Sequence, residues 1–230
     1  MTVRGPLFLS FEGLDGSGKT TQIERLAASL AALGRHVEVF REPGGTELGE
    51  RIRELVLIGG DVSPWAEVSL FAAARAQLVQ DKIRPSLEAG RDVICDRYLD
   101  SSVAYQGAAR GLGEEAVFDW NQRVTGGLLP DATFLLALPA EEAGARIARS
   151  PAADPVRATP TPDRLERESL AFRARVERAY AELARRSARV VSLDATLAPE
   201  AIASQVFAHV QALLATAQLS GDASRLGTHE

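Results

Sequence analysis

The chain contains 230 residues, which is enough for one large α/β domain with a substantial hydrophobic core. Its 26 Lys and Arg residues against 31 Asp and Glu residues argue against a surface that binds nucleic acid or anionic lipid, so a small-molecule ligand is favoured. The single Cys95 excludes an intrachain disulfide, and no apolar stretch approaches the roughly 20 residues of a membrane span. With no export signal at its start, we expect a cytoplasmic protein that binds neither nucleic acid nor a membrane.

Short apolar runs alternate with longer helical patterns, which is typical of a parallel sheet covered by helices on both faces. Residues 1–217 are expected to form a single domain, and the polar residues 218–230 a disordered tail. The five predicted strands are Leu7–Phe11, His36–Phe40, Asp92–Cys95, Thr133–Leu138 and Val190–Leu193. The predicted helices lie near Gly18–Leu33, Thr46–Leu57, Pro64–Ala89, Glu114–Thr125, Ala140–Ala148, Asp163–Ser187 and Pro199–Ala217.

The first strand runs into a glycine-rich loop, residues 13–20, which an amphipathic helix follows. The glycines let backbone N–H groups turn toward a polyphosphate, Lys19 is expected to reach the terminal phosphates, and Thr20 to hold Mg²⁺. A glycine-rich turn at the sheet edge is the alternative, but the strand before and the helix after favour a nucleoside triphosphate site. The residues expected to bind the nucleotide are Gly13, Leu14, Asp15, Gly16, Ser17, Gly18, Lys19, Thr20 and Thr21.

Asp15 is an acidic residue inside this loop, where a carboxylate beside phosphate charges is unfavourable unless it points elsewhere. It is either a solvated loop residue or a group that accepts a hydrogen bond from a second ligand, such as a sugar hydroxyl. The second alternative makes this a two-substrate site.

The second strand is followed by Arg41, at the carboxyl edge of the sheet where ligands of open α/β folds bind. Arg41 can clamp a phosphate through two parallel N–H groups, and Pro43 with the two following glycines gives an irregular backbone that allows a close approach. The peptide bond before Pro43 is a candidate for the cis form. An ordinary turn into a helix capped by Thr46 is the alternative.

Asp96 and Arg97 stand at the end of the third strand, beside the phosphate loop. A carboxylate at this place orients Mg²⁺ or the acceptor in phosphoryl-transfer enzymes, and Arg97 would supply positive charge to the phosphate being attacked. A structural ion pair between the two side chains is the alternative.

Two helical segments carry side chains suited to a base and a sugar. Phe71 and Arg75 stand one turn apart, so a ring can stack on a base while the guanidinium donates to a base carbonyl. Plain core packing is the alternative for Phe71. Ser102, Tyr105 and Gln106 also recur at helical spacing and offer a hydroxyl, a ring and an amide.

Four prolines between Ser150 and Pro162 predict a loop of about a dozen residues, within a lid of about residues 149–163. Arg149 and Arg157 lie at or in this insert. Loop arginines are usually solvated, but one that closes over the transferring phosphoryl group adds roughly 10³ to 10⁵ in rate.

Taken together, these segments resemble bacterial thymidylate kinases, which have a P-loop nucleoside monophosphate kinase fold. The resemblance implies that the chain phosphorylates dTMP to dTDP with ATP and Mg²⁺, in the supply of dTTP, as a homodimer. It covers Leu7 to about Ala212 and rests on the phosphate loop with its internal acid, Arg41–Thr46, Phe71 with Arg75, Asp96–Tyr98, Ala104–Gly107 and Asp163–Glu166.

The resemblance also implies individual roles. Lys19, Asp96 and Arg97 would be catalytic together with a lid arginine, Arg149 before Arg157, because the phosphate loop lacks the arginine that some relatives carry there. Asp194 and Ala195 match the family's loop against adenine. The implied acceptor contacts are Asp15 with the 3′-hydroxyl, Arg41 and Arg97 with the phosphate, Phe71 with the thymine ring, Arg75 with a base carbonyl, Tyr105 with the deoxy edge of the sugar, and Ser102 and Gln106 beside the base.

Two other functions remain open at this stage. Another nucleoside monophosphate or deoxynucleoside kinase would share the core and differ in the base pocket. A nucleotide-dependent switch or partitioning protein would need no second nucleotide site, so it would leave Asp15, Arg41, Phe71 and Arg75 without a purpose.

Overall fold

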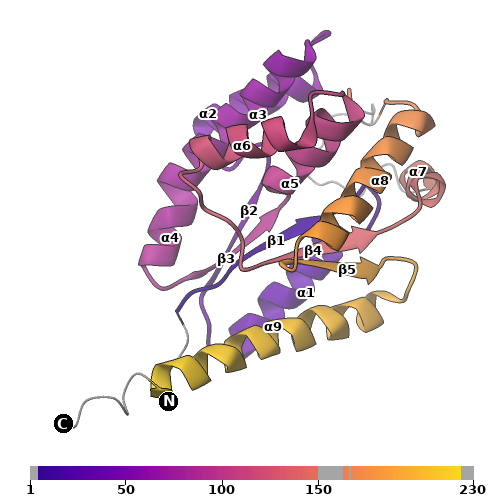
Figure 1. Ribbon diagram of the computed structural model, residues 1–230. Coiled ribbons are helices and arrows are strands. Elements are labelled where there is room, and N and C mark those ends of the chain that lie inside the picture. The colour runs from indigo at the N-terminus through magenta and orange to yellow at the C-terminus, as the bar shows by residue number, and fades with distance from the viewer. Residues whose placement is uncertain (1–4, 150–162, 166, 224–230) are drawn as a thin grey trace.

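The computed structural model describes residues 5–149, 163–165 and 167–223, and its centre is a five-stranded parallel sheet (Figure 1). The strand order is β2-β3-β1-β4-β5, so the strand that precedes the phosphate loop lies in the middle. All five predicted strands are present, with ends that differ by no more than about one residue. They are β1 (Phe8–Glu12), β2 (Val37–Arg41), β3 (Asp92–Asp96), β4 (Ala132–Ala137) and β5 (Val190–Asp194).

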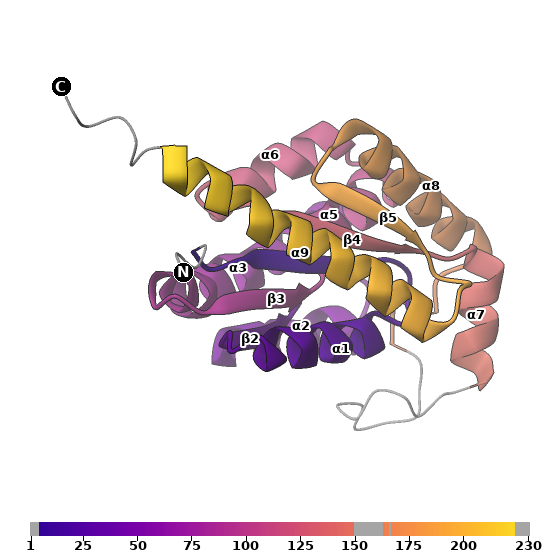
Figure 2. The same ribbon diagram turned by 90° about the horizontal axis from the view of Figure 1, so that it is seen from below.

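Helices cover both faces of this sheet (Figures 1 and 2). The long last helix packs beside the first on one face. The helices that follow β3, and the helix that begins at Leu170, cover the other face. Their bounds are α1 (Lys19–Ala32), α2 (Glu47–Leu57), α3 (Pro64–Leu78), η1 (Val79–Ile83), α4 (Arg84–Glu88), α5 (Leu99–Ser102), η2 (Val103–Ala109), α6 (Glu114–Val124), α7 (Ala140–Arg149), α8 (Leu170–Arg186) and α9 (Pro199–Ala223).

Burial explains why the strands in the middle of the sheet consist mainly of apolar residues. Every residue of β1 is buried, as a strand with neighbours on both edges and helices on both faces requires. The edge strand β2 is only half-buried, and its sequence accordingly includes the charged residues Glu38 and Arg41 among apolar ones.

Four helix predictions need correction. The segment predicted as one helix over Pro64–Ala89 contains the π-helical stretch η1, and the helix after β3 continues into a second one, η2. The helix predicted from Asp163 begins only at Leu170, because Ser169 caps it by accepting a hydrogen bond from the Phe172 N–H at 3.2 Å. The last helix, predicted to end at Ala217, extends to Ala223, within the segment predicted as a tail.

Parts of the predicted insert and tail lie outside the described residues, namely 150–162, with Arg157, and 224–230. Glu166, the last residue of the motif that starts at Asp163, lies outside them as well. Among the described helices, none combines the length and the apolar character needed to cross a membrane.

Candidate active site

The carboxyl ends of three strands meet at one edge of the sheet. Phe11 of β1 and Arg41 of β2 both stand opposite Asp96 of β3 in the strand register. The parallel arrangement therefore brings the phosphate loop, the Arg41 segment and the Asp96–Arg97 pair together, as the sequence predicted.

The glycines of the phosphate loop allow a tight path that a larger residue would block. Gly13 has a φ of 134°, and a Cβ at this position would lie 2.6 Å from the carbonyl oxygen of Leu136. Gly18, with a φ of 95°, precedes α1, and no side chain caps this helix. The first turn of α1 is thus left to an outside anion, as a phosphate-binding loop requires.

Lys19 folds back onto this loop. Its Nζ donates to the carbonyl oxygens of Gly13 and Leu14 at 3.2 and 3.1 Å and lies 3.7 Å from Asp15 Oδ1. Burial lowers the pKa of Lys19, and the neighbouring Arg97 charge lowers it further. An anion at this place would offset both effects, so the loop suits the terminal phosphates of a nucleotide.

Arg97 links the end of β3 to the phosphate loop. Its NH2 donates to Asp15 Oδ1 at 2.6 Å, and its guanidinium lies 5.4 Å from the centre of the Tyr105 ring. Among the described residues other than glycine, Arg97 is the one with a positive φ, 70°. Such a backbone costs about 1 kcal/mol or more and is typical of functional sites. Asp15 thus faces Arg97, toward the predicted acceptor side.

Glu12 supports this turn and was missed by the sequence analysis. It is the last residue of β1 and fully buried, and Oε1 accepts from the backbone N–H groups of Tyr98 and Ser101 at 2.8 and 3.3 Å. Oε2 accepts from Ser101 Oγ at 2.6 Å and Tyr180 OH at 2.8 Å. Burial raises the pKa of Glu12, and the nearby Asp100 charge adds to the rise. A charged residue closing the apolar run of the first strand was the available signal.

Arg41 is paired with Glu50 at the start of α2. Its NH2 donates to both carboxylate oxygens of Glu50, at 3.0 and 2.8 Å, while its buried NH1 has no acceptor among the described residues. The bond between Glu42 and Pro43 is cis, as the sequence suggested, and Thr46 caps α2 through the Gly49 N–H at 3.0 Å. The turn and the Thr46 cap of the alternative interpretation are therefore present, and the phosphate contact of Arg41 stays a prediction.

Arg75 is almost completely buried, and each of its three guanidinium nitrogens has a hydrogen-bond acceptor. Nε donates to Glu42 Oε2 at 2.7 Å, and NH2 lies 2.6 Å from the same oxygen in an ion pair. NH2 donates to the carbonyl oxygen of Tyr98, and NH1 to Ser102 Oγ and Asn121 Oδ1. Burial raises the pKa of Glu42 to about 7, against the opposing charge of Arg75. Arg75 must therefore exchange one acceptor before it can donate to a base.

Phe71, Tyr105 and Gln106, the other predicted base and sugar residues on helices, are also buried. Phe71 packs against Ile52 of α2 in a small apolar cluster, and Gln106 donates to Glu67 at 2.7 Å. Tyr105 and Asp15 line one small cavity, as the predicted sugar contacts require, and its other walls include Leu14, Ile147, Leu165 and Phe172.

The residues predicted to contact adenine and the predicted lid arginine Arg149 form hydrogen bonds outside the phosphate loop. Ala195 accepts a hydrogen bond from Arg146 NH2 at 3.0 Å, and Asp194 is exposed and accepts from Thr196. Arg149 is exposed at the end of α7, and its Nε donates to the Ala145 carbonyl at 3.1 Å. The structure therefore does not bring Arg149 to the phosphate loop.

Asp96 is the predicted metal or acceptor ligand. Its Oδ1 is buried and has no hydrogen-bond partner in the described part of the chain, and the same holds for Ser17 Oγ in the phosphate loop. Buried polar atoms without partners are uncommon and point to a missing ligand. Thr20 and Thr21, at the start of α1, are exposed and accessible to one.

A phosphate loop after the central strand, with basic side chains from neighbouring strand ends at the same edge, defines a P-loop kinase of the nucleoside monophosphate class. The family model for thymidylate kinase matches residues 11–206. The chain therefore belongs to the thymidylate kinase family, and the resemblance noted from its motifs is confirmed.

Individual relatives agree with this assignment. The chain is 50% identical over 206 residues to the thymidylate kinase of Thermomicrobium roseum, covering 88% of this chain and 93% of the relative. It is 45% identical over 206 residues to that of Deinococcus radiodurans, covering 89% and 96%. A crystal structure of thymidylate kinase from Ehrlichia chaffeensis is similar in fold, with a TM-score of 0.71 and 29% identity over 90% of this chain and 99% of the other.

Proposed function

We propose that this enzyme transfers the terminal phosphoryl group of ATP to dTMP, giving dTDP in the supply of dTTP. Family membership supports the proposal, and one contact carries it. The hydrogen bond of 2.6 Å between Arg97 and Asp15 joins the strand end that would hold the acceptor phosphate to the loop that would hold the donor. Donor and acceptor pockets would then face each other across a short distance.

Charge and position account for most of the chemistry. Two anionic phosphates must approach in line, so the protein lowers the barrier mainly by placing positive charge where negative charge develops. Lys19 would neutralise the donor phosphates, while Arg97 and Arg41 would hold the acceptor. The pairing with Asp15 keeps the Arg97 side chain in place before substrate binds.

The residues present fit a Mg²⁺ ion. Mg²⁺ in kinases takes one or two protein oxygens and completes its shell with phosphate oxygens and water. Thr20 and Asp96, whose buried Oδ1 has no partner among the described residues, would hold the ion. When bound, it neutralises charge on the donor phosphates.

A further arginine would complete the charge around the transferring group. Arg149 and Arg157 remain the two candidates, since the phosphate loop itself contains none. Alanine at each position, followed by turnover assays, tests this point. Normal rates for both variants would remove the lid arginine from the mechanism.

A coupled assay for ADP release tests the function directly. Purified protein is supplied with ATP, Mg²⁺ and either dTMP, dUMP, dCMP or dAMP. We expect the highest kcat/KM with dTMP. A higher value for another monophosphate would support a different kinase of this fold, and no ADP release with any of them would overturn the kinase function. A switch protein would also show no heat of binding when titrated with dTMP.

Assembly and location are part of the same proposal. We expect a cytoplasmic homodimer, and exposed Trp65 on α3 and Trp120 on α6 support an apolar surface for a second copy. Light scattering at several protein concentrations measures the assembly. A monomer at every concentration would contradict it.

A further inference from the structure

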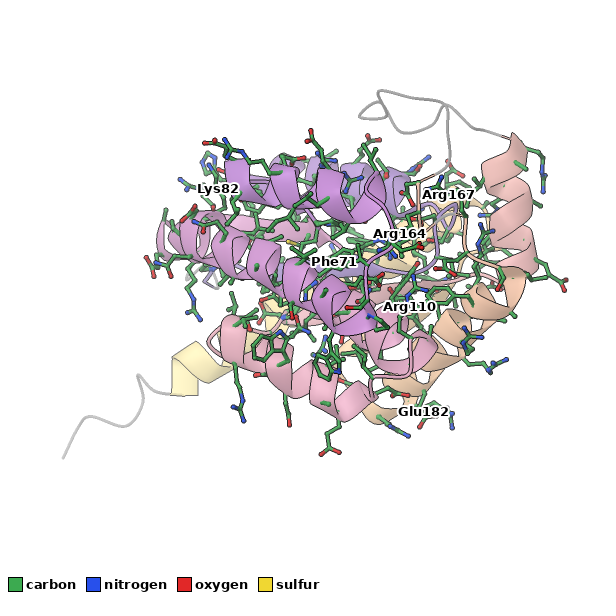
Figure 3. The ribbon with its side chains drawn as sticks, turned by 90° about the horizontal axis from the view of Figure 1, so that it is seen from above. Phe71, Lys82, Arg110, Arg164, Arg167 and Glu182 are labelled. Carbon is green, nitrogen blue, oxygen red and sulfur yellow. The ribbon has the colours of Figure 1, made fainter. Side chains whose placement is uncertain are left out.

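Glu67 is a buried charged residue for which the proposed reaction has no use. It lies on α3 with no exposed surface, and its carboxylate accepts hydrogen bonds from three side chains of two other segments. Gln106 Nε2 donates to Oε1 at 2.7 Å, and Arg164 NH2 donates to Oε2 at 2.6 Å. Arg110 donates to both oxygens, at 3.5 and 3.3 Å. Figure 3 labels Arg110, Arg164 and Phe71, and Phe71 belongs to the same helix as Glu67.

The same face of α3 carries the proposed base site. Glu67, Phe71 and Arg75 follow one another at intervals of four residues, so they lie on one side of the helix. Arg75 contacts Ser102 at 3.1 Å and Glu67 contacts Gln106 at 2.7 Å. Two polar contacts thus join α3 to the helix after β3, and Phe71 lies between them in the sequence.

The contact with Glu67 fixes the orientation of the Gln106 amide. A carboxylate only accepts hydrogen bonds, so Gln106 must turn its NH2 group toward Glu67. The amide oxygen is consequently directed away from Glu67, and no donor to it is present in the described part of the chain. Gln106 retains only 2% of its surface, so a rotated amide would set its oxygen against the carboxylate in a dry environment.

We propose that Glu67 is a positioning residue that determines which atom Gln106 offers to the base. The proposal rests on the placement of Gln106 beside the base, given above as part of the proposed function. An amide oxygen held in this way accepts from a pyrimidine ring nitrogen that carries hydrogen, as in thymine and uracil. Cytosine has an unprotonated nitrogen at that position, which would oppose one acceptor to another. Glu67 thereby selects for an N–H on the pyrimidine ring, through Gln106.

The two arginines hold the carboxylate rather than the base. Arg164 is itself fixed by the end of α2, where its Nε donates to the Val56 carbonyl at 2.9 Å. Arg110 also pairs with Glu168 at 2.5 Å and lies over the Phe172 ring at 4.6 Å. Glu67 therefore has little freedom to move away from Gln106.

Glu67→Gln is the test variant, because its amide can either donate or accept and so permits both orientations of Gln106. We expect the KM for dTMP to rise about tenfold with the KM for ATP unchanged. The ratio of kcat/KM for dTMP over dCMP should also fall about tenfold. Arg75 is the same in the variant and the unaltered enzyme, so its own contribution to base selectivity cancels when the two ratios are compared. An unchanged ratio would overturn the proposal.

Arg110→Met is the matched control, since it removes one cation from Glu67 but keeps the contact with Gln106 and an apolar stem over Phe172. It should leave the dTMP to dCMP ratio as in the unaltered enzyme. A shift as large as that of Glu67→Gln would mean that any disturbance of this cluster changes selectivity, and would overturn the positioning role.

Two further variants keep the outcome interpretable. If Glu67→Gln does not fold, the double variant Glu67→Gln/Arg110→Met restores the charge balance, and comparison with Arg110→Met gives the same ratio test. Gln106→Leu separates the two levels of the argument. An unchanged KM for dTMP in Gln106→Leu would show that Gln106 does not touch the base. A raised KM in Gln106→Leu together with an unchanged KM and selectivity in Glu67→Gln would overturn the positioning role alone.

Discussion

Replacement of Glu12 gives the sharpest test of how the site is held. The Glu12 carboxylate accepts four hydrogen bonds, two from backbone N–H groups and two from the hydroxyls of Ser101 and Tyr180. Glu12→Ala removes all four and leaves the buried N–H of Tyr98 without an acceptor. At about 1 kcal/mol for each bond, with a further penalty for the orphaned donor, we expect a loss of about 3 to 5 kcal/mol in the free energy of unfolding.

Glu12→Gln should behave quite differently. The amide oxygen can still accept from the backbone of Tyr98 and Ser101, while the new NH2 group donates to hydroxyls that can rotate to accept. The loss of the carboxylate also removes repulsion with Asp100. We expect a change within about 1 kcal/mol, measured by urea unfolding. In the alanine variant kcat/KM for dTMP should fall at least about tenfold, because the turn that carries Arg97 loosens. Equal damage in both variants would refute the hydrogen-bond argument and point to the charge itself.

Three further outcomes follow from the same geometry. Gly13→Ala, whose Cβ would lie 2.6 Å from the Leu136 carbonyl oxygen at a φ of 134°, should cost at least about 2 kcal/mol in urea unfolding, and a normal midpoint would contradict this. Glu42 has a folded pKa of about 7 against 4.5 for the free group, so its contribution to stability is complete below pH 4.5 and is lost as the pH rises through about 7. A carboxyl carbon of Glu42 that titrates below 5 in NMR, despite Arg75, would disprove that sign. Arg41→Ala should raise the KM for dTMP about tenfold or more with little change in the KM for ATP, and equal changes in both would place Arg41 elsewhere.

The sequence predicted the sheet and the phosphate loop well because their signals are local. A short apolar run such as Leu7 to Phe11 predicts a central strand, because such a strand is buried on both faces. The glycines that follow it predict the tight turn. The strand ends then place Arg41 and Asp96 at one edge by topology alone.

The buried carboxylates could not be predicted in this way. Glu12 bonds to Tyr180, 168 residues further along the chain, and Glu67 bonds to Arg164, 97 residues away. No periodic pattern marks such a pair, because its stability depends on a fold that must already exist. The π-helical stretches were also not predicted, because one widened turn changes the spacing of apolar residues too little to detect in the sequence.

The strand that carries the phosphate loop obtains its neighbours late in synthesis. Phe8 pairs in register with Val93, and Leu9 with Ala132, so β1 must wait for more than half of the chain before both of its edges are occupied. On the ribosome β1 would be made before both of its neighbours and remain unpaired for many seconds at about 5–20 residues per second. Until these strands pair, the strand ends that form the nucleotide site are not assembled. Ligand binding can therefore protect this segment only after β3 and β4 have been made.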